Sequence, residues 1–341
     1  MENVESRLDP GSIVLVTGAN GYIGSTIADL LLQEGYYVRG TVRGHKPWLQ
    51  RYFDEKYGKM RFEAVVVPDL GVQEDLVSAL EGAQGLIHVA ADVAFQPDAE
   101  KIISQTKMHT VAALQAAARV STMRSFVLTS SASAACSPSI NEQGIAINDD
   151  TWNDRAVAAA WCKTTSPEEL PYNVYAAAKT EGEQVLWKFA RENNPTFTVN
   201  TVLPSACFGS ILCREIGGST MGVVRRVLSG DSEMFSLLPP QWFVDVTDCA
   251  RLHLAALIVK SIADQRIFAF AETFNWTDII TILRHIRPGN NDIPEPPAHE
   301  GRDLSHVTPR LKAECILRQY WNSGGWTSLG DSIAAGIGDI S

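Results

Sequence analysis

Thr17-Gly18-Ala19-Asn20-Gly21-Tyr22-Ile23-Gly24 follows a run of β-branched and leucine residues at positions 13 to 16 and precedes an apolar segment with helical spacing at positions 25 to 32. A β-branched run that breaks into spaced glycines and then into helical periodicity predicts a strand, a tight turn and a helix. We expect this turn to bind the pyrophosphate of a dinucleotide.

Each glycine of the turn has a physical reason. Gly18 allows a sharp bend after the strand, Gly21 allows backbone N–H groups to approach the pyrophosphate, and Gly24 allows close helix packing. An anion at the helix N-terminus is favoured by unpaired N–H groups and by the macrodipole. The alternative is a simple strand-to-helix turn. The expected cofactor contacts here are Gly18, Asn20, Gly21, Tyr22, Ile23 and Gly24.

Composition limits the possible functions. The 341 residues, 45% of them hydrophobic, can form one large domain or two smaller ones with a full core. A net charge of −10 argues against nucleic acid and favours a small-molecule partner. The six cysteines form no Cys-x-x-Cys pair and no metal-like group with histidines, so we expect no metal and a reducing compartment. Without a leader-like N-terminus or a membrane-length apolar run, we expect a cytoplasmic protein that does not bind membranes.

Strand and helix patterns alternate along the first half of the chain. Further strands are expected at residues 36–43, 61–67, 85–91, 125–131 and 197–203, with helices at 99–120 and 172–192. Alternation of this kind predicts parallel strands with helices on both faces, and ligands then bind beyond the carboxyl ends of the strands. The expected fold class is therefore α/β, a Rossmann-type doubly wound parallel sheet.

The pattern changes after Pro204. Apolar stretches become shorter and glycine and proline more frequent, with helical faces at residues 249–260, 276–286 and 329–337. We therefore expect a dinucleotide-binding domain over residues 1–204 and a smaller, mainly helical substrate-binding lobe over 205–341. The long irregular segment 132–171 is expected to form one wall of the substrate pocket, because long loops in compact proteins are usually functional or mobile.

Basic residues near the second strand favour NADPH as the cofactor. Enzymes that select NAD place an acid here for the ribose 2′-hydroxyl, whereas a 2′-phosphate needs cations. This chain has Arg39, Arg43 and Lys46 and no acid until Asp54. The alternative is that these are ordinary solvated charges.

The fourth expected strand ends in small residues, Ala90 and Ala91, which would let a cofactor pass close to the backbone. The same strand contains His88. A histidine inside a buried parallel strand is better explained as a hydrogen-bonded core residue than as a catalytic base.

Tyr175 and Lys179 are four residues apart on an expected helix, so their side chains share a face. An ammonium about 4 Å from a phenol is worth roughly 4 kcal/mol at an effective dielectric constant of 20. That energy would lower a phenol pKa of about 10 by about three, toward a value suited to acid–base catalysis. Alone, the spacing also fits a solvated helix face, but Ser131 at a strand end and the glycine turn favour a catalytic site.

The glycine turn, Ser130-Ser131 and Tyr175-x-x-x-Lys179 together resemble the extended short-chain dehydrogenase/reductase family. The sequences at 38–43, 187–189 and 239–244 are similar to dihydroflavonol 4-reductases and, more closely, to fungal NADPH-dependent aldehyde/ketone reductases. The likeness spans nearly the whole chain and is firmest over residues 12 to 205.

The resemblance implies a role for each of these residues. Ser131 would bind the substrate carbonyl, Tyr175 would give it a proton, and Lys179 would hold the nicotinamide ribose and lower the pKa of Tyr175. The remaining implied cofactor contacts lie near the adenine or nicotinamide: Asp69, Leu70, Thr129 and Pro204.

The chain departs from the family at one point of its proton relay. Many members have Asn in the helix before the fifth strand, whereas residues 105–110 here contain none. Tyr172 and Ser133 are weaker rivals for Tyr175 and Ser131.

The leading hypothesis is an NADPH-dependent reductase of a small hydrophobic or aromatic aldehyde or ketone, acting as a monomer or homodimer. Aromatic residues that could wall the pocket, or simply belong to the core, are Trp152, Trp161, Phe208, Trp242 and Phe243. The alternatives are a nucleotide-sugar epimerase or dehydratase on the same fold, and a non-catalytic regulator that senses NADPH.

Overall fold

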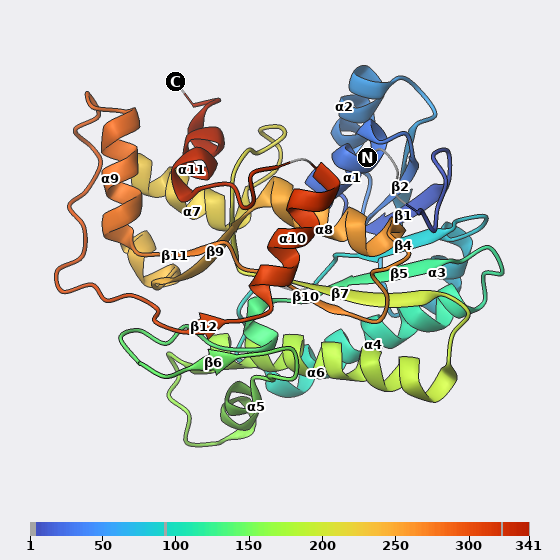
Figure 1. The fold of residues 1–341 in the computed structure, drawn as a ribbon, viewed down its shortest axis with the longest axis horizontal. Helices are drawn as coiled ribbons and strands as arrows, with labels where there is room; N and C mark the ends of the chain where they lie inside the picture. Colours follow the sequence, from blue (N-terminus) through green and yellow to red (C-terminus); the bar gives the residue numbers. More distant parts are fainter. Residues whose placement is uncertain (1–4, 92–93, 322, 341) are drawn as a thin grey trace.

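A seven-stranded parallel sheet forms the centre of the molecule (Figure 1). The structure is a computed structural model, and it describes residues 5–91, 94–321 and 323–340. The strand order is β10-β7-β5-β4-β1-β2-β3, and every neighbouring pair is parallel. The strands are β1 (Ile13–Thr17), β2 (Tyr37–Val42), β3 (Phe62–Val66), β4 (Gly85–His88), β5 (Ser125–Thr129), β7 (Thr198–Pro204) and β10 (Arg266–Ala269). The predicted Rossmann-type sheet is confirmed.

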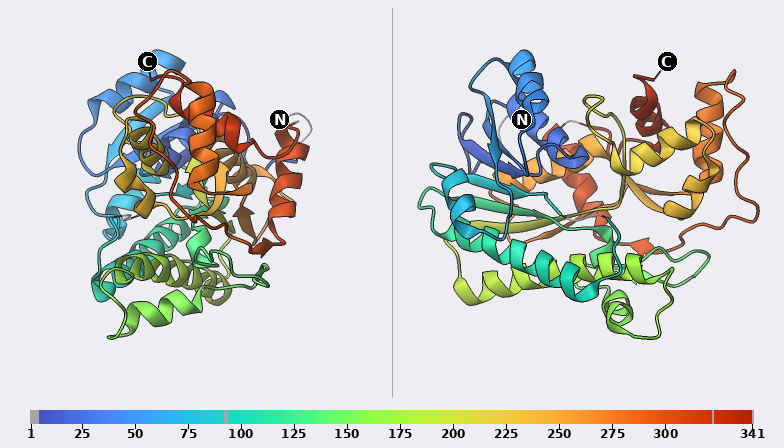
Figure 2. Two further views of the ribbon diagram at one scale, coloured as in Figure 1. Left: turned by 90° about the vertical axis from the view of Figure 1, so that its left-hand side faces the viewer. Right: turned by 180° about the vertical axis from the view of Figure 1, so that it is seen from behind.

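Helices cover both faces of the sheet, as Figures 1 and 2 show. One face carries α1 (Tyr22–Gln33), α2 (Pro47–Tyr57) and α8 (Val246–Ile258). The other carries α3 (Gln73–Ala79), α4 (Ala99–Ala118) and α6 (Leu170–Asn193), with α4 and α6 packed side by side. The central strands β1, β4 and β5 are buried between the two helical layers, and their sequences are mostly apolar.

The sheet does not end with the strand at Pro204. Strand β10 returns from the later part of the chain and pairs with β7, with Ala269 opposite Pro204. Helix α8 also comes from beyond residue 204 and packs on β4, β5 and β7. This corrects the expectation that everything after residue 204 forms the smaller lobe, since residues 246–269 complete the central sheet and its covering layer.

The smaller lobe lies beside the sheet and contains helices with short strands. Its helices are α7 (Ser219–Leu228), α9 (Trp276–Ile286) and α11 (Leu329–Ile337), and a 3-10 turn covers Ser232–Leu237. A three-stranded sheet in the order β11-β9-β8 joins them, formed by Glu272–Phe274, Gln241–Asp245 and Ala206–Phe208. Helix α10 (Arg310–Trp321) packs back on α8 and β10.

The expected pocket segment, residues 132–171, has local structure of its own. It begins with a 3-10 turn over Ala132–Ala134 and contains β6 (Ala146–Ile147) and α5 (Asp154–Trp161). Strand β6 pairs with β12 (His306–Val307), which ties this segment to the C-terminal part of the chain.

Within the described ranges, no helix combines the length and the apolar content needed to cross a bilayer. Nor do three or more His, Cys, Asp or Glu side chains of those ranges gather where they could hold a metal ion.

Candidate functional site

The glycine turn between β1 and α1 is too tight for side chains. Gly18 has a left-handed φ of +66°, and a Cβ there would lie 3.1 Å from the Ala90 Cα. A Cβ on Gly24 would lie 2.3 Å from the Gly18 carbonyl oxygen, which is a backbone atom that cannot rotate away. These two positions therefore require glycine, as expected for a turn that brings backbone N–H groups to a pyrophosphate.

The N-terminus of α1 suits an anion. Its N-cap is Gly21, no side chain caps it, and its first turn holds no acidic residue. Asn20 is half-buried in the turn, and Ile23 packs against the core. The Tyr22 hydroxyl is buried and donates to the Gly209 carbonyl at 2.8 Å, so only the backbone of Tyr22 is available to a ligand. The residues present thus fit a dinucleotide pyrophosphate.

His88 is held in the core next to this turn. The Thr17 hydroxyl oxygen accepts hydrogen bonds from the backbone N–H groups of Val89 and Ala90, so its own proton points to the His88 Nδ1, 3.0 Å away. This contact fixes the imidazole as its Nε2–H tautomer. Burial lowers the pKa of His88 to about 3, with the nearby charges of His109 and Lys179 acting in the same direction. The prediction of a satisfied core histidine is confirmed.

Arg43 and Lys46 lie just beyond the carboxyl end of β2. Both side chains are exposed, and Lys46 is the N-cap residue of α2. Burial lowers the pKa of His109 on α4, and the positive charge of Arg43 adds to that lowering. The His109 Nε2 lies 3.3 Å from a carboxylate oxygen of Asp69. This edge therefore combines exposed cations with an exposed carboxylate.

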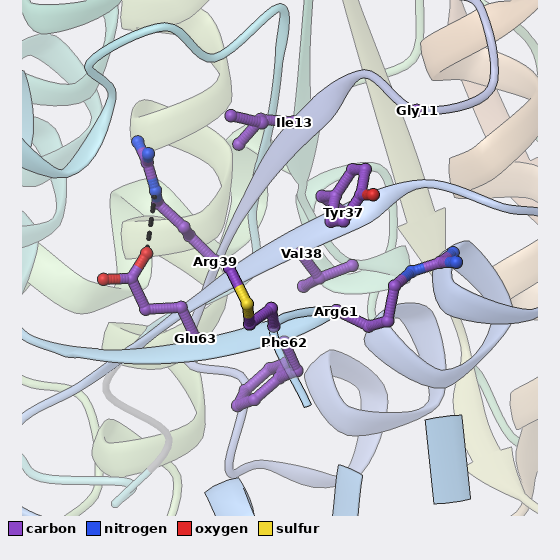
Figure 3. A pocket seen from close by; sticks show the side chains of 9 residues that line it. Gly11, Ile13, Tyr37, Val38, Arg39, Arg61, Phe62 and Glu63 are labelled. Atoms are coloured by element: carbon purple, nitrogen blue, oxygen red, sulfur yellow. Dashed lines mark hydrogen bonds and ion pairs between the residues drawn. The ribbon is translucent and has the colours of Figure 1, made fainter. Parts of the chain in front are cut away.

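Arg39 does not lie at this edge, which corrects the prediction that it contacts the cofactor. It is level with Leu15 in the middle of β1, and its guanidinium bonds to Glu63 and to the carbonyls of Ala79 and Glu81. Figure 3 shows the Arg39–Glu63 pair in a surface pocket. The pocket has a volume of about 330 Å³ and is lined by Gly11 and by other residues near the amino ends of the strands. Cofactors bind at the opposite ends of parallel strands.

The other predicted cofactor contacts all follow or end strands at the carboxyl edge of the sheet. They are Asp69, Leu70, Ala90, Ala91, Thr129 and Pro204.

The three predicted catalytic residues are brought together at the end of β5. The Tyr175 Oη lies 3.4 Å from the Ser131 Oγ. The Lys179 ammonium donates to the Thr129 carbonyl at 3.2 Å, one helical turn along α6. The Ser131 Oγ also accepts the Ser133 N–H at 3.2 Å, which fixes its rotamer. A phenol, a hydroxyl and an ammonium thus converge where the sheet binds its ligands.

The pKa values of this group differ from the expectation drawn from spacing. Burial raises the pKa of Tyr175, and the hydrogen bond with Ser131 only partly opposes it. Burial also lowers the pKa of Lys179 to about 8, while the charge of Glu183 acts in the opposite direction. Desolvation therefore moves the Tyr175 pKa in the direction opposite to the expected lowering, and the phenol stays protonated at neutral pH.

Several residues of the site were not expected. The Phe95 ring packs on that of Tyr175 with centroids 4.8 Å apart, from a loop where Phe95 has a left-handed φ of 47°. Glu183 lies buried one turn after Lys179. The spacing of Glu183 from Lys179 was visible in the sequence, whereas the position of Phe95 depends on a loop conformation that no sequence pattern predicts.

The expected aromatic wall belongs partly to the core. Phe208 and Phe243 are fully buried in the small sheet of the lobe, where their rings stack with centroids 5.8 Å apart. Trp152 packs under the Arg266 guanidinium at 3.9 Å, and Trp242 donates from its indole to the Ser305 hydroxyl. Trp161 is exposed on α5.

Comparison with known families agrees with this geometry. Residues 14–269 match the model of the NAD dependent epimerase/dehydratase family. This chain belongs to that family. The predicted resemblance to extended short-chain dehydrogenases/reductases is thereby confirmed, and the matched region includes the glycine turn, Ser131, Tyr175 and Lys179.

Relatives cover almost all of the chain. A ketoreductase, adrE, of Penicillium rubens is 44% identical over 331 residues, covering 96% of each protein. Aldehyde reductase 2 of Sporidiobolus salmonicolor is 37% identical and covers 99% of each. Among solved structures, yeast methylglyoxal/isovaleraldehyde reductase Gre2 complexed with NADPH superposes with a TM-score of 0.77 at 22% identity, covering 96% of this chain and 97% of that one. At that identity the likeness is one of fold.

Proposed function

We propose that this chain uses NADPH to reduce the carbonyl of a small hydrophobic or aromatic aldehyde or ketone to an alcohol. The observation that carries the proposal is the meeting of Tyr175, Ser131 and Lys179 at the same carboxyl edge of the sheet as the glycine turn. Its support includes full-length relatives that are named ketoreductases and an aldehyde reductase.

The hydroxyls of Tyr175 and Ser131 would share one carbonyl oxygen. They are 3.4 Å apart, so one oxygen to the side of the pair, at hydrogen-bond distance from each, can accept from both. When bound, the reduced nicotinamide supplies the hydride that reaches the carbonyl carbon. As charge develops on the oxygen, Tyr175 gives it a proton, and the products are the alcohol and the oxidised cofactor.

The raised pKa of Tyr175 suits this direction of reaction. A proton donor must be protonated before the transfer, and burial keeps the phenol neutral. Lys179 carries a positive charge below a pH of about 8 and would stabilise the phenolate left after the transfer. Lys179 would also bind the nicotinamide ribose.

NADPH rather than NADH is proposed because of Arg43 and Lys46. Both are exposed at the end of β2, where the 2′-phosphate of the adenine ribose would lie. No acidic residue stands between the end of β2 and Asp54.

The test is NADPH oxidation by the purified protein with a panel of aromatic and aliphatic carbonyls. Tyr175→Phe should lower kcat by about 10²- to 10⁴-fold, the range of general acid catalysis. Tyr172→Phe is the matched control, because it removes a phenol one turn earlier whose contact is Ser133 at 3.4 Å. Loss of turnover in the Tyr172 variant alone, or tight NADPH binding with no turnover of any carbonyl by the wild type, would contradict the proposal.

A further inference from the structure

Glu183 is a fully buried acid on the helix that carries Tyr175 and Lys179. It lies one turn after Lys179 on α6, and its side chain has no exposed surface. A buried carboxylate is costly unless charges and hydrogen bonds compensate it. Its partners therefore show what the structure uses it for.

The Glu183 carboxylate joins α6 to three strands of the sheet. It accepts hydrogen bonds from the hydroxyls of Ser130 at 2.7 Å and Thr201 at 2.9 Å, which belong to the end of β5 and to β7. It also pairs with Arg266 of β10 through Nε at 2.7 Å. The indole N–H of Trp187 donates to it from the next turn of α6 at 3.2 Å. Both carboxylate oxygens are thus satisfied by groups from separate elements.

Arg266 extends this network to the pocket segment. Its Nη1 donates to the carbonyls of Asp149 at 2.7 Å and Thr151 at 2.8 Å. The guanidinium also lies 3.9 Å from the centre of the Trp152 ring. The Nε and Nη2 of this arginine thus bond to the acid, and its Nη1 bonds to the pocket segment.

We propose that Glu183 is a positioning residue for carbonyl reduction: it holds α6 against β5 so that Tyr175 and Lys179 face Ser131, and through Arg266 it holds the pocket segment. The inference rests on the proposed function. Ser130 immediately precedes Ser131, so the 2.7 Å bond from Ser130 to Glu183 constrains both sides of the 3.4 Å contact between Tyr175 and Ser131. Apolar residues often replace a buried ion pair without loss of stability, so stability alone does not explain this pair.

The charge of Glu183 also acts on Lys179. It raises the pKa of Lys179 against the stronger effect of burial. Among the described residues, other titratable groups near Lys179 include Tyr175 on its own helix and His88 on β4, and His253 on α8 bonds to the hydroxyl of the same Thr129 at 2.8 Å. Burial keeps both histidines neutral, with pKa values lowered to about 3 for His88 and about 4 for His253. Glu183 is therefore the acid whose removal should change the titration of Lys179.

The experiment compares Glu183→Gln with Glu181→Gln. Glu181 is a matched control because it lies on the same helix, pairs with Lys107 at 2.7 Å and accepts an indole N–H from Trp161 at 3.2 Å, away from the sheet. Glu183→Gln should lower kcat by about 10- to 100-fold through misplacement of the reacting groups. It should also move the alkaline limb of the kcat profile to lower pH, whereas Glu181→Gln should match the wild type.

A double variant, Glu183→Gln with Arg266→Met, guards against simple unfolding. Removal of the acid alone leaves Arg266 buried without its partner, which should lower the melting temperature. Removal of both charges should recover part of that loss. The double variant should keep the low kcat and the shifted limb. It should also show a raised KM, because the bonds to residues 149 and 151 are lost.

The dissociation constant of NADPH, measured over the same pH range, is a readout that needs no turnover. As the pH rises, the affinity for NADPH should begin to fall at a lower pH in the Glu183 variants than in the wild type, because Lys179 loses its proton at a lower pH in those variants. One outcome would contradict the positioning role and leave the proposed function standing. In that outcome the wild type turns over carbonyls, and the Glu183 variants have the same kcat and the same pH profile as Glu181→Gln. If the wild type binds NADPH without turnover, the proposed function fails, and the pH dependence of NADPH affinity alone decides the role of Glu183.

Discussion

Replacing Arg43 by alanine removes a cation from the edge where the adenine ribose of the cofactor would lie. Arg43 directly follows β2 and is exposed. Arg39, four residues earlier, carries the same charge but bonds to Glu63 and two carbonyls at the amino side of the sheet. The two arginines therefore form a matched pair: one at the proposed phosphate site and one away from it.

The expected magnitude follows from one charge-assisted hydrogen bond. Such bonds contribute about 1.5–3 kcal/mol, and because Arg43 is exposed and screened by salt, the lower end applies. At about 1.4 kcal/mol for each factor of ten, NADPH should bind roughly tenfold more weakly to Arg43→Ala. NADH has a hydroxyl in place of the phosphate, so its affinity should change by less than about twofold.

Fluorescence titration of both dinucleotides at one fixed ionic strength gives the four dissociation constants for wild type and variant. The ratio of NADPH to NADH affinity is the decisive quantity, because it cancels general damage to the site. Arg39→Ala should leave that ratio unchanged, although it removes its hydrogen bonds. The reasoning is refuted if Arg43→Ala weakens both cofactors alike, or if Arg39→Ala changes the ratio.

Three other outcomes are expected. The reduction rate should be highest below a pH of about 8 and fall above it, because the pKa of Lys179 is lowered to that value and the uncharged amine cannot stabilise a phenolate. A profile of kcat from pH 6 to 10 checks this prediction. Gly24→Ala should abolish NADPH binding in a titration, since its Cβ would lie 2.3 Å from the Gly18 carbonyl oxygen and the turn would have to open. Phe208→Ala should lower the free energy of unfolding by about 3–5 kcal/mol in chemical denaturation, because the ring is fully buried.

Local signals predicted most elements of the fold. Helices α9 and α11 occupy the predicted ranges, 276–286 and 329–337, and each begins after a capping residue, Asn275 or Ser328. Helix α6 begins at Leu170, close to its predicted start, and presents Tyr175 and Lys179 on one side. Caps and periodicity depend on neighbours a few residues away, so the sequence reveals them directly.

Long-range pairing and strand register were the parts that the sequence did not reveal. Strand β10 has only four residues and begins with Arg266, so its pattern does not predict a buried strand, and its pairing with β7 depends on distant residues. The wrong position of Arg39 has a related cause. The register between β2 and β1 places Arg39 level with Leu15 instead of at the strand end, and this register depends on pairing with another part of the chain.

The acid–base group shows why spacing alone gives an incomplete account of chemistry. The four-residue interval correctly places a phenol and an ammonium on one side of α6, but the interval contains no information about solvent. Burial acts on the two groups in opposite directions: it raises the pKa of Tyr175 and lowers that of Lys179. Both shifts favour the neutral forms, and the charge of Glu183 partly opposes the shift of Lys179. The buried acid that the sequence motif omits is therefore a group that raises the pKa of the motif's lysine against the effect of burial.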